Sequence, residues 1–137
     1  WTGGRERVVA AICRKVAEIK GNSGEIEVWG DGTAVRSYTF VNDMVDGIFR
    51  LMHSDLEGGV NIGCPQYVSV DDLVNCVAKV SGKSISIKHI EGPVGVESRN
   101  FSNERIYSTG WKPQFFLEDG IRENYPWVNE QVQKNKR

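Results

Sequence analysis

The sequence lacks the features of a metal centre, a membrane span or a polyanion-binding surface. It has only three cysteines and two histidines in 137 residues and no CxxC spacing, so a zinc site is not expected. No apolar run approaches the roughly 18 residues of a transmembrane helix. The 17 basic and 18 acidic residues nearly cancel, which argues against a general nucleic-acid binder. We interpret Cys13, Cys64 and Cys76 as reduced thiols of a cytoplasmic protein.

Several catalytic motifs are also absent. The chain contains no strand–GxGxxG–helix unit, no Tyr-x-x-x-Lys pair and no GxSxG. A dinucleotide-binding half and a complete catalytic apparatus are therefore not expected within these residues. The length suits one domain with its own core, which we assign to residues 1–137.

Helices alternating with short strands are what the hydrophobic pattern predicts, and the fold class is α/β. Apolar residues at spacings of three and four predict helices over 5–20, 42–53, 70–80, 102–109 and from 117 onward. Short strands are predicted over 25–29, 60–63 and 85–89. Asn42 or Asp43 is expected to cap the second helix and Ser69 the third, while Pro126 should kink the last one.

The most informative stretch is Trp29-Gly30-Asp31-Gly32 and the extended run that begins at Arg36. The two glycines suit a turn with positive φ. In an extended run, Ser37 and Thr39 lie on one face and the aromatic rings that follow each of them lie on the other. The Arg36 guanidinium could then fork onto a phosphate. The alternative is a hairpin in which Arg36 pairs with a surface carboxylate.

The sequence contains a series of short motifs whose order resembles that of a known family. They are Gly3-Gly4-Arg5-Glu6, Cys13-Arg14-Lys15, Trp29-Gly30-Asp31-Gly32, Arg36-Ser37-Tyr38-Thr39-Phe40-Val41, Val60-Asn61-Ile62-Gly63, Gly92-Pro93-Val94-Gly95-Val96, Ser98-Arg99-Asn100 and Gly110-Trp111-Lys112-Pro113. In this order they resemble the C-terminal, substrate-binding portion of the extended short-chain dehydrogenase/reductase superfamily, with its Rossmann half absent. Within it the chain is most similar to NAD-dependent nucleotide-sugar epimerases.

This resemblance implies a substrate, a cofactor and an assembly. The complete enzyme would bind NAD in a Rossmann half and act on a nucleotide sugar of the GDP-mannose type, with oxidation at C4 acidifying the protons at C3 and C5. Because this portion packs against the Rossmann half in the superfamily, its helices should expose apolar surface here, and a homo-oligomer is expected. The alternatives are another epimerase, dehydratase or decarboxylase of the superfamily, or a stand-alone binding domain without chemistry.

The resemblance also assigns residues by position. Glu6, Arg7 and Val8 would line the sugar site. The positions expected to bind nucleotide or diphosphate are Lys15, Ala34, Val35, Arg36, Ser37 and Arg99. Arg7 stands where the family has its acid–base lysine, so it is the candidate catalytic residue. Since a guanidinium stays charged, Arg7 could hold an enolate but should not act as an acid.

Overall fold

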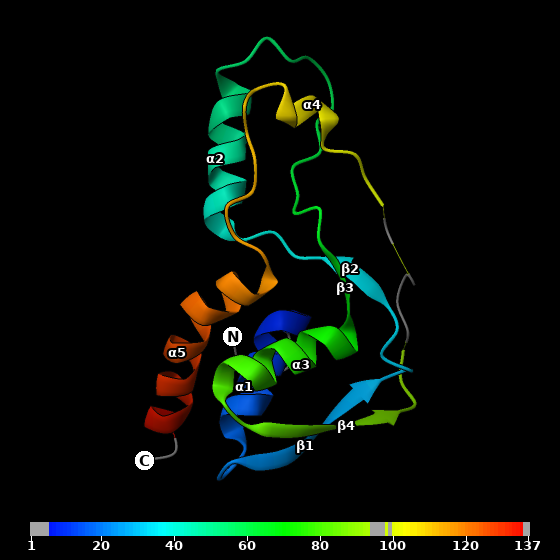
Figure 1. Cartoon of the computed structure of the whole chain (residues 1–137), viewed down its shortest axis with the longest axis vertical. Coiled ribbons are helices and arrows are strands. Elements are labelled where there is room, and N and C mark those ends of the chain that lie inside the picture. Colours follow the sequence, from blue (N-terminus) through cyan, green and yellow to red (C-terminus); the bar gives the residue numbers. More distant parts are fainter. Residues whose placement is uncertain (1–5, 94–97, 99, 136–137) are drawn as a thin grey trace.

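The computed structural model describes residues 6–93, 98 and 100–135 (Figure 1). The elements in chain order are α1 (Val8–Glu18), β1 (Ser23–Trp29), β2 (Val35–Ser37), α2 (Val41–Met52), β3 (Tyr67–Ser69), α3 (Val70–Ser81), β4 (Ser84–Ile90), α4 (Glu104–Tyr107) and α5 (Leu117–Asn135). The predicted helices and the strands near 25–29 and 85–89 are confirmed, with shifted ends.

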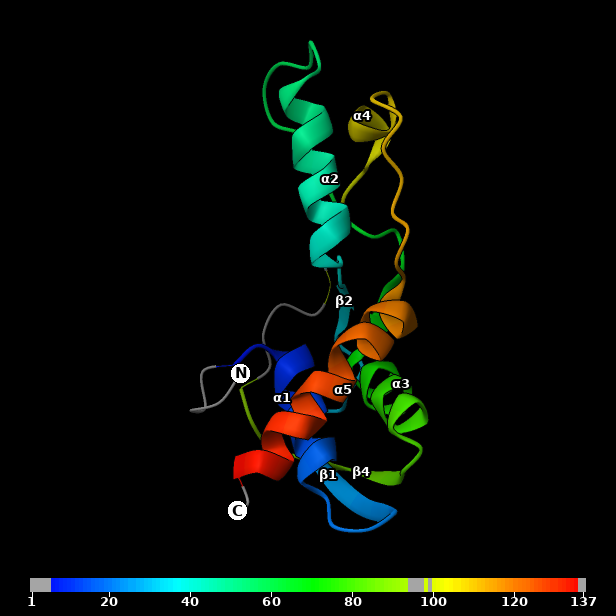
Figure 2. The ribbon, with the colours of Figure 1, turned by 90° about the vertical axis from the view of Figure 1, so that its left-hand side faces the viewer.

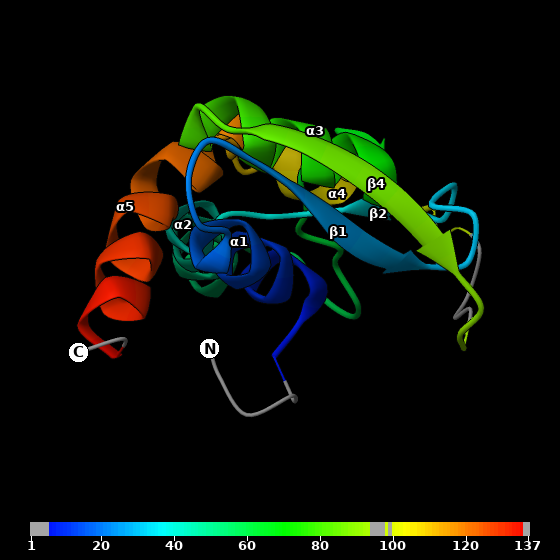
Figure 3. The same ribbon diagram turned by 90° about the horizontal axis from the view of Figure 1, so that it is seen from below.

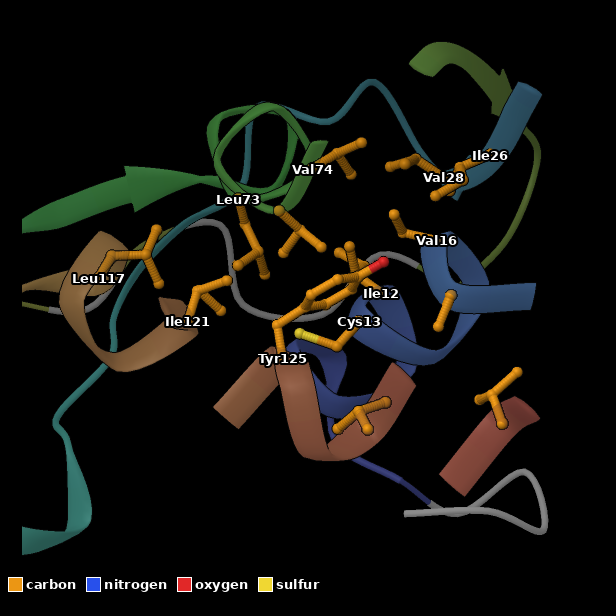
Figure 4. Close-up of a cluster of buried hydrophobic side chains, with 14 residues drawn as sticks. Ile12, Cys13, Val16, Ile26, Val28, Leu73, Val74, Leu117, Ile121 and Tyr125 are labelled. Carbon is orange, nitrogen blue, oxygen red and sulfur yellow. The ribbon is translucent and has the colours of Figure 1, made fainter. Parts of the chain in front are cut away.

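One end of the molecule is a helical layer on a small sheet. β1 and β4 pair in parallel from Ser23↔Ser84 to Trp29↔Ile90, α1 and α3 lie on one face of this sheet, and α5 packs against α1 and α3 (Figures 1 and 3). The buried side chains that these elements share form the core (Figure 4), among them Ile12, Val16, Ile26, Val28, Leu73, Val74, Ile121 and Tyr125. The apolar stripes of the helices therefore form one continuous core.

The other end is built around α2 and α4, which lie at the far end of the long axis (Figures 1 and 2). Trp111 is fully buried there, and its Nε1 donates to the Asp43 carbonyl at 2.9 Å. Gly47 lets α2 come close, because a Cβ at this position would lie 2.6 Å from Ile62 Cγ2 and 3.1 Å from Trp111 Nε1. Trp111 thus anchors the packing at this end of the molecule.

The predicted cap of α2 is wrong. The N-cap is Phe40, without a side-chain cap hydrogen bond, and Asn42 and Asp43 lie inside the first turn. The buried Asp43 carboxylate instead accepts the backbone N–H groups of Gln114 and Phe115 at 3.0 and 2.9 Å. The Asp43 side chain therefore makes a long-range contact instead of the helix cap that the local sequence pattern predicted.

The predicted strand over 60–63 is also wrong. Within the described residues this segment has no strand partner, whereas Tyr67–Ser69, not predicted as a strand, pairs with β2 in antiparallel register. A strand needs a neighbour for its backbone hydrogen bonds, and apolar alternation alone does not supply one.

Ser69 caps α3 as predicted. Its hydroxyl accepts the Asp72 N–H at 3.0 Å, and the Asp72 carboxylate accepts the Ser69 N–H, so a capping box is complete. The predicted short helix over 102–109 is shorter in the structure, where α4 spans Glu104–Tyr107 with Asn103 as its N-cap. α5 continues as one element across Pro126.

Large apolar side chains remain exposed along one face of α2. Their spacing follows the helical repeat and their exposed fractions run from 45% to 76%: Val41, Val45, Ile48, Phe49 and Met52. We call these five residues the α2 stripe. None of the helices in the described part of the chain combines the length and apolar composition needed to cross a bilayer.

Candidate functional site

The glycine turn between β1 and β2 has the backbone predicted for it. Gly30 and Gly32 both have φ of +74°. Gly32 also lies against the start of α3: its carbonyl accepts the Asp71 N–H at 3.2 Å, and a Cβ on it would lie 2.0 Å from Asp71 Oδ1. Only glycine satisfies both the dihedral and the contact, so the turn fixes how β2 leaves β1.

The Asp31 side chain stabilises this turn by hydrogen bonds to a residue of the same turn. Its carboxylate accepts from the Thr33 hydroxyl at 2.6 Å and from the Thr33 N–H at 3.0 Å. These two hydrogen bonds, the hydroxyl first, lower the pKa of Asp31 below its usual range. Asp31 therefore stays ionised and braces the turn that precedes the candidate binding strand.

The predicted nucleotide-binding run lies on and just before β2. Ala34, Val35, Arg36 and Ser37 are all half-buried, and Arg36 pairs with Val68 of β3 in the β2–β3 register. Arg36 Nη1 donates to the Val35 carbonyl at 2.7 Å. The pKa of Tyr38 is raised by burial and lowered to a smaller degree by the Arg36 charge. The guanidinium is thus tied to the backbone of β2, and its charge acts on the Tyr38 hydroxyl.

The three residues predicted to line the sugar site lie at the start of α1, and their surroundings differ. The Glu6 side chain is 3% exposed, and its Oε1 accepts from Arg14 Nε at 2.9 Å and also pairs with Arg14 Nη2. Arg7 is the exposed N-cap of α1, and Val8 is the partly exposed first residue of that helix. Glu6 therefore ties the chain to α1, while Arg7 and Val8 remain accessible to a ligand.

Lys15 lies against β1, not β2. Its Nζ donates to the Glu27 carbonyl at 3.0 Å, and it lines an open depression of about 370 Å³ with Glu18, Glu25, Ile26 and Glu27. Three glutamates line the same depression as this one lysine, and two of them also pair with other bases, Glu18 with Arg14 at 2.9 Å and Glu27 with Lys88 at 3.2 Å. This acidic lining favours the predicted diphosphate contact less than a basic one would. Arg99, the remaining predicted residue, lies outside the described residues.

Sequence reasoning missed Thr39, Cys64 and Asn103. The Ser37 hydroxyl donates to the Cys64 carbonyl at 2.6 Å, and the Cys64 N–H donates to Thr39 Oγ1 at 2.9 Å. The buried Asn103 donates through Nδ2 to the neighbouring Gly63 carbonyl at 2.6 Å. The shared face of Ser37 and Thr39 was visible in the sequence, but their partner 25 to 27 residues away was not.

The cysteines lack the character of nucleophiles. Burial, followed by the nearby Cys76, raises the pKa of the Cys13 thiol to about 11. Burial also raises the pKa values of Cys64 and Cys76. All three thiols therefore stay protonated at neutral pH. Across residues 6–93, 98 and 100–135, no three His, Cys, Asp or Glu side chains gather as metal ligands.

The described residues do not fit the NAD cofactor that the resemblance implies for the complete enzyme. A dinucleotide pyrophosphate is bound where a glycine-rich turn leads from a strand into a helix N-terminus. Here the glycine turn after β1 leads into β2, and its Gly32 carbonyl is already bonded to Asp71. No step of NAD chemistry can be assigned to these residues.

Comparison with known proteins identifies relatives of the whole chain. The profile of the NAD dependent epimerase/dehydratase family matches residues 2–63. The chain is 41% identical over 137 residues to the GDP-mannose 3,5-epimerase of Arabidopsis thaliana, covering 99% of this chain and 36% of that protein. It is 33% identical over 129 residues to the probable GDP-L-fucose synthase 1 of Oryza sativa subsp. japonica, covering 91% and 39%. The chain thus spans little more than a third of these relatives.

Solved structures share the fold. UDP-glucuronic acid 4-epimerase from Bacillus cereus superposes with a TM-score of 0.80 at 20% identity, over 92% of this chain and 40% of that one. UDP-glucose 4-epimerase from Thermotoga maritima gives 0.78 at 23% identity, over 98% and 41%. These likenesses confirm the predicted α/β fold class, and the sequence matches confirm the resemblance to nucleotide-sugar epimerases.

Proposed function

We propose that this chain, which is similar to members of the NAD dependent epimerase/dehydratase family, forms the nucleotide-sugar-binding part of such an enzyme, acting on GDP-mannose. One observation carries this proposal: the 41% identity to a GDP-mannose 3,5-epimerase extends over 137 residues. A protein named as a GDP-L-fucose synthase also matches over 91% of the chain, which favours a guanosine over a uridine nucleotide. The reaction proposed for the complete enzyme is 3,5-epimerisation.

Arg36 gives the proposal its physical support. It is half-buried on β2, and the turn that precedes this strand is stabilised by Asp31 and Gly32. A guanidinium in a partly desolvated, well-braced position binds a diphosphate more strongly than one on a mobile surface chain. We propose Arg36 as the main diphosphate ligand in the described part of the chain, with Ala34, Val35 and Ser37 beside it.

The other assigned residues take lesser roles. Arg7 and Val8 are accessible at the start of α1, so they suit a contact with the sugar, and Arg7 would stabilise negative charge without donating a proton. The Arg14 ion pair holds Glu6 in place beside them. Lys15 contributes less because of its acidic surroundings. Arg99 is retained as a second diphosphate ligand on the strength of the sequence resemblance.

NAD belongs to the complete enzyme in this proposal and is bound by residues that this chain does not supply. The chain by itself, as a substrate-binding domain over residues 1–137, is expected to show no NAD-dependent turnover. Three free thiols suit a reducing compartment, so we place the protein in the cytoplasm.

We also propose that the chain self-associates through the α2 stripe. Contiguous exposed apolar patches mark interaction surfaces. By the helical repeat, the ion pair between Asp46 and Arg50 at 2.8 Å lies on the side of α2 away from this stripe. Two antiparallel copies of α2 related by a two-fold axis would therefore bury the apolar side chains of the stripe against each other. A second copy of the chain is the proposed occupant.

Calorimetric titration with GDP, GDP-mannose and UDP-glucose tests the proposed substrate. We expect binding of both guanosine ligands and at least tenfold weaker binding of UDP-glucose, because a site built for one base leaves polar groups unpaired with another. Preference for UDP-glucose would favour a different nucleotide-sugar enzyme of the superfamily. Absence of all binding would favour a domain without a nucleotide site.

A further inference from the structure

The peptide between Gly63 and Pro65 is a junction of three chain segments. The Cys64 N–H donates to Thr39 Oγ1 at 2.9 Å, the Cys64 carbonyl accepts from the Ser37 hydroxyl at 2.6 Å, and the preceding Gly63 carbonyl accepts from Asn103 at 2.6 Å. Cys64 is 1% exposed and Asn103 is 6% exposed. We call these five residues, Ser37, Thr39, Gly63, Cys64 and Asn103, the Cys64 junction.

The junction lies where β2 needs support. The β2–β3 ladder has only three residue pairs, from Val35↔Ser69 to Ser37↔Tyr67, and it is separate from the β1–β4 sheet. Two-stranded ladders are marginal in water without further packing. Figures 1 and 2 place β2 and β3 between the two ends of the molecule, so this short ladder lies at their joint. Side-chain hydrogen bonds from Ser37 and Thr39 therefore replace the missing strand neighbours.

A second connection reaches the same ladder. The Phe101 N–H donates to the Tyr67 hydroxyl at 3.2 Å, and the two rings lie 5.7 Å apart. Tyr67 is the β3 partner of Ser37. The segment 100–103 is thereby tied to β2 both through Asn103 and Gly63 and through Phe101 and Tyr67.

We propose that Ser37 and Thr39 are positioning residues that set Arg36 for binding the diphosphate of a nucleotide. Ser37 directly follows Arg36, and the hydroxyls of Ser37 and Thr39 bond to the backbone C=O and N–H of one buried residue, Cys64, so the strand cannot rotate or slide without breaking these hydrogen bonds. A guanidinium binds a diphosphate bidentately only when its approach direction is fixed. This inference rests on the proposed function, since it assumes that Arg36 contacts the diphosphate.

The test uses Thr39→Val, which keeps the shape and removes the acceptor for the Cys64 N–H. We expect amide hydrogen exchange at Cys64 to accelerate and GDP affinity to fall roughly three- to tenfold, the equivalent of one neutral hydrogen bond. Thr39→Ser retains the hydroxyl and should restore both. Ser37→Ala, expected to lower affinity similarly, provides a second variant should Thr39→Val fold poorly. Ser108→Ala is the matched control, because its hydroxyl also donates to a backbone carbonyl, that of Arg105 at 2.7 Å.

A double-mutant cycle separates positioning from general stabilisation. In the Arg36→Ala background, Thr39→Val should cause no further loss of affinity, because the residue through which it acts is gone. Additive losses would overturn the positioning role. Unchanged GDP affinity despite faster Cys64 exchange would overturn it as well while leaving the proposed function intact. Failure of the unmodified chain to bind GDP would overturn the proposed function and this inference with it.

Discussion

Arg36 is the residue on which the proposed nucleotide site depends most. Its replacement by alanine should weaken GDP binding by about 1.5–3 kcal/mol, the range for hydrogen bonds to charged groups, or roughly ten- to a hundredfold. Lys15→Ala should cost less, since its ammonium sits among three glutamates. Arg122→Ala, which removes an exposed arginine paired with Glu118, is the matched control for lost positive charge. Equal affinities for all three variants would favour the alternative hypothesis, in which Arg36 pairs with a surface carboxylate and does not bind phosphate.

Gly32 is the residue that most constrains the turn before β2. Gly32→Ala should lower the free energy of unfolding by about 1–3 kcal/mol, because the new Cβ adds strain at positive φ and meets the Asp71 carboxylate. Gly58→Ala is a matched control: it has φ of +76° but nothing within 4 Å. Urea unfolding should show a larger loss for Gly32→Ala. Equal losses would mean that the Asp71 contact adds nothing to the backbone strain.

At the scale of elements, Glu118 links α3 to α5. It accepts from Lys79 at 2.7 Å and from Arg122 at 2.6 Å, and these contacts, Lys79 first, lower its pKa. A carboxylate whose pKa is lower in the folded state stabilises the fold above its unfolded pKa, and this contribution is lost as pH falls through the folded value. Stability should therefore decline on acidification below about pH 4.5, the unperturbed pKa of glutamate.

Glu118→Gln should flatten this acidic limb of the stability profile, measured by thermal unfolding between neutral and acidic pH. Glu130→Gln serves as the control, because Glu130 pairs only within α5, with Lys134 at 2.6 Å. The same pH profile for both variants would show that the α3–α5 link does not contribute.

Elements whose signals are local were predictable from the sequence. The Ser69 cap and the positive φ of Gly30 and Gly32 depend on neighbours within a few residues, and each is found as predicted. The β1–β4 pairing joins residues 61 apart, and the Asp43 and Cys64 contacts also reach across the chain. Periodicity carries no information about such partners, which is why the strand over 60–63 and the cap at Asp43 were wrong.

The candidate site was predictable to a smaller degree. The alternation of side chains placed Ser37 and Thr39 on one face, and both bond to the backbone of the same residue, Cys64. The acidic lining of the depression beside Lys15 could not be anticipated, because Glu25 and Glu27 belong to β1 and come together with Lys15 only in the folded chain. Electrostatic context depends on tertiary packing even when a residue's position in a family motif is clear.

At the scale of the whole molecule, the α2 stripe should govern association. Sedimentation at micromolar concentration should show a dimer for the unmodified chain and a monomer for Phe49→Gln, whose side chain is 60% exposed in the stripe. Phe116→Gln removes an exposed aromatic outside the stripe and should leave the dimer intact. A monomeric unmodified chain, or a dimer that survives Phe49→Gln, would contradict the proposed interface.

The most direct test of the nucleotide site is to map GDP-mannose onto the chain by amide chemical-shift perturbation. The proposed site predicts saturable shifts centred on Arg36 and Ser37, extending through the junction to Cys64, with little change at Lys15 and Glu27. Shifts centred instead on the depression beside Lys15, or no saturable shifts at all, would contradict the claim that β2 carries the nucleotide-sugar site.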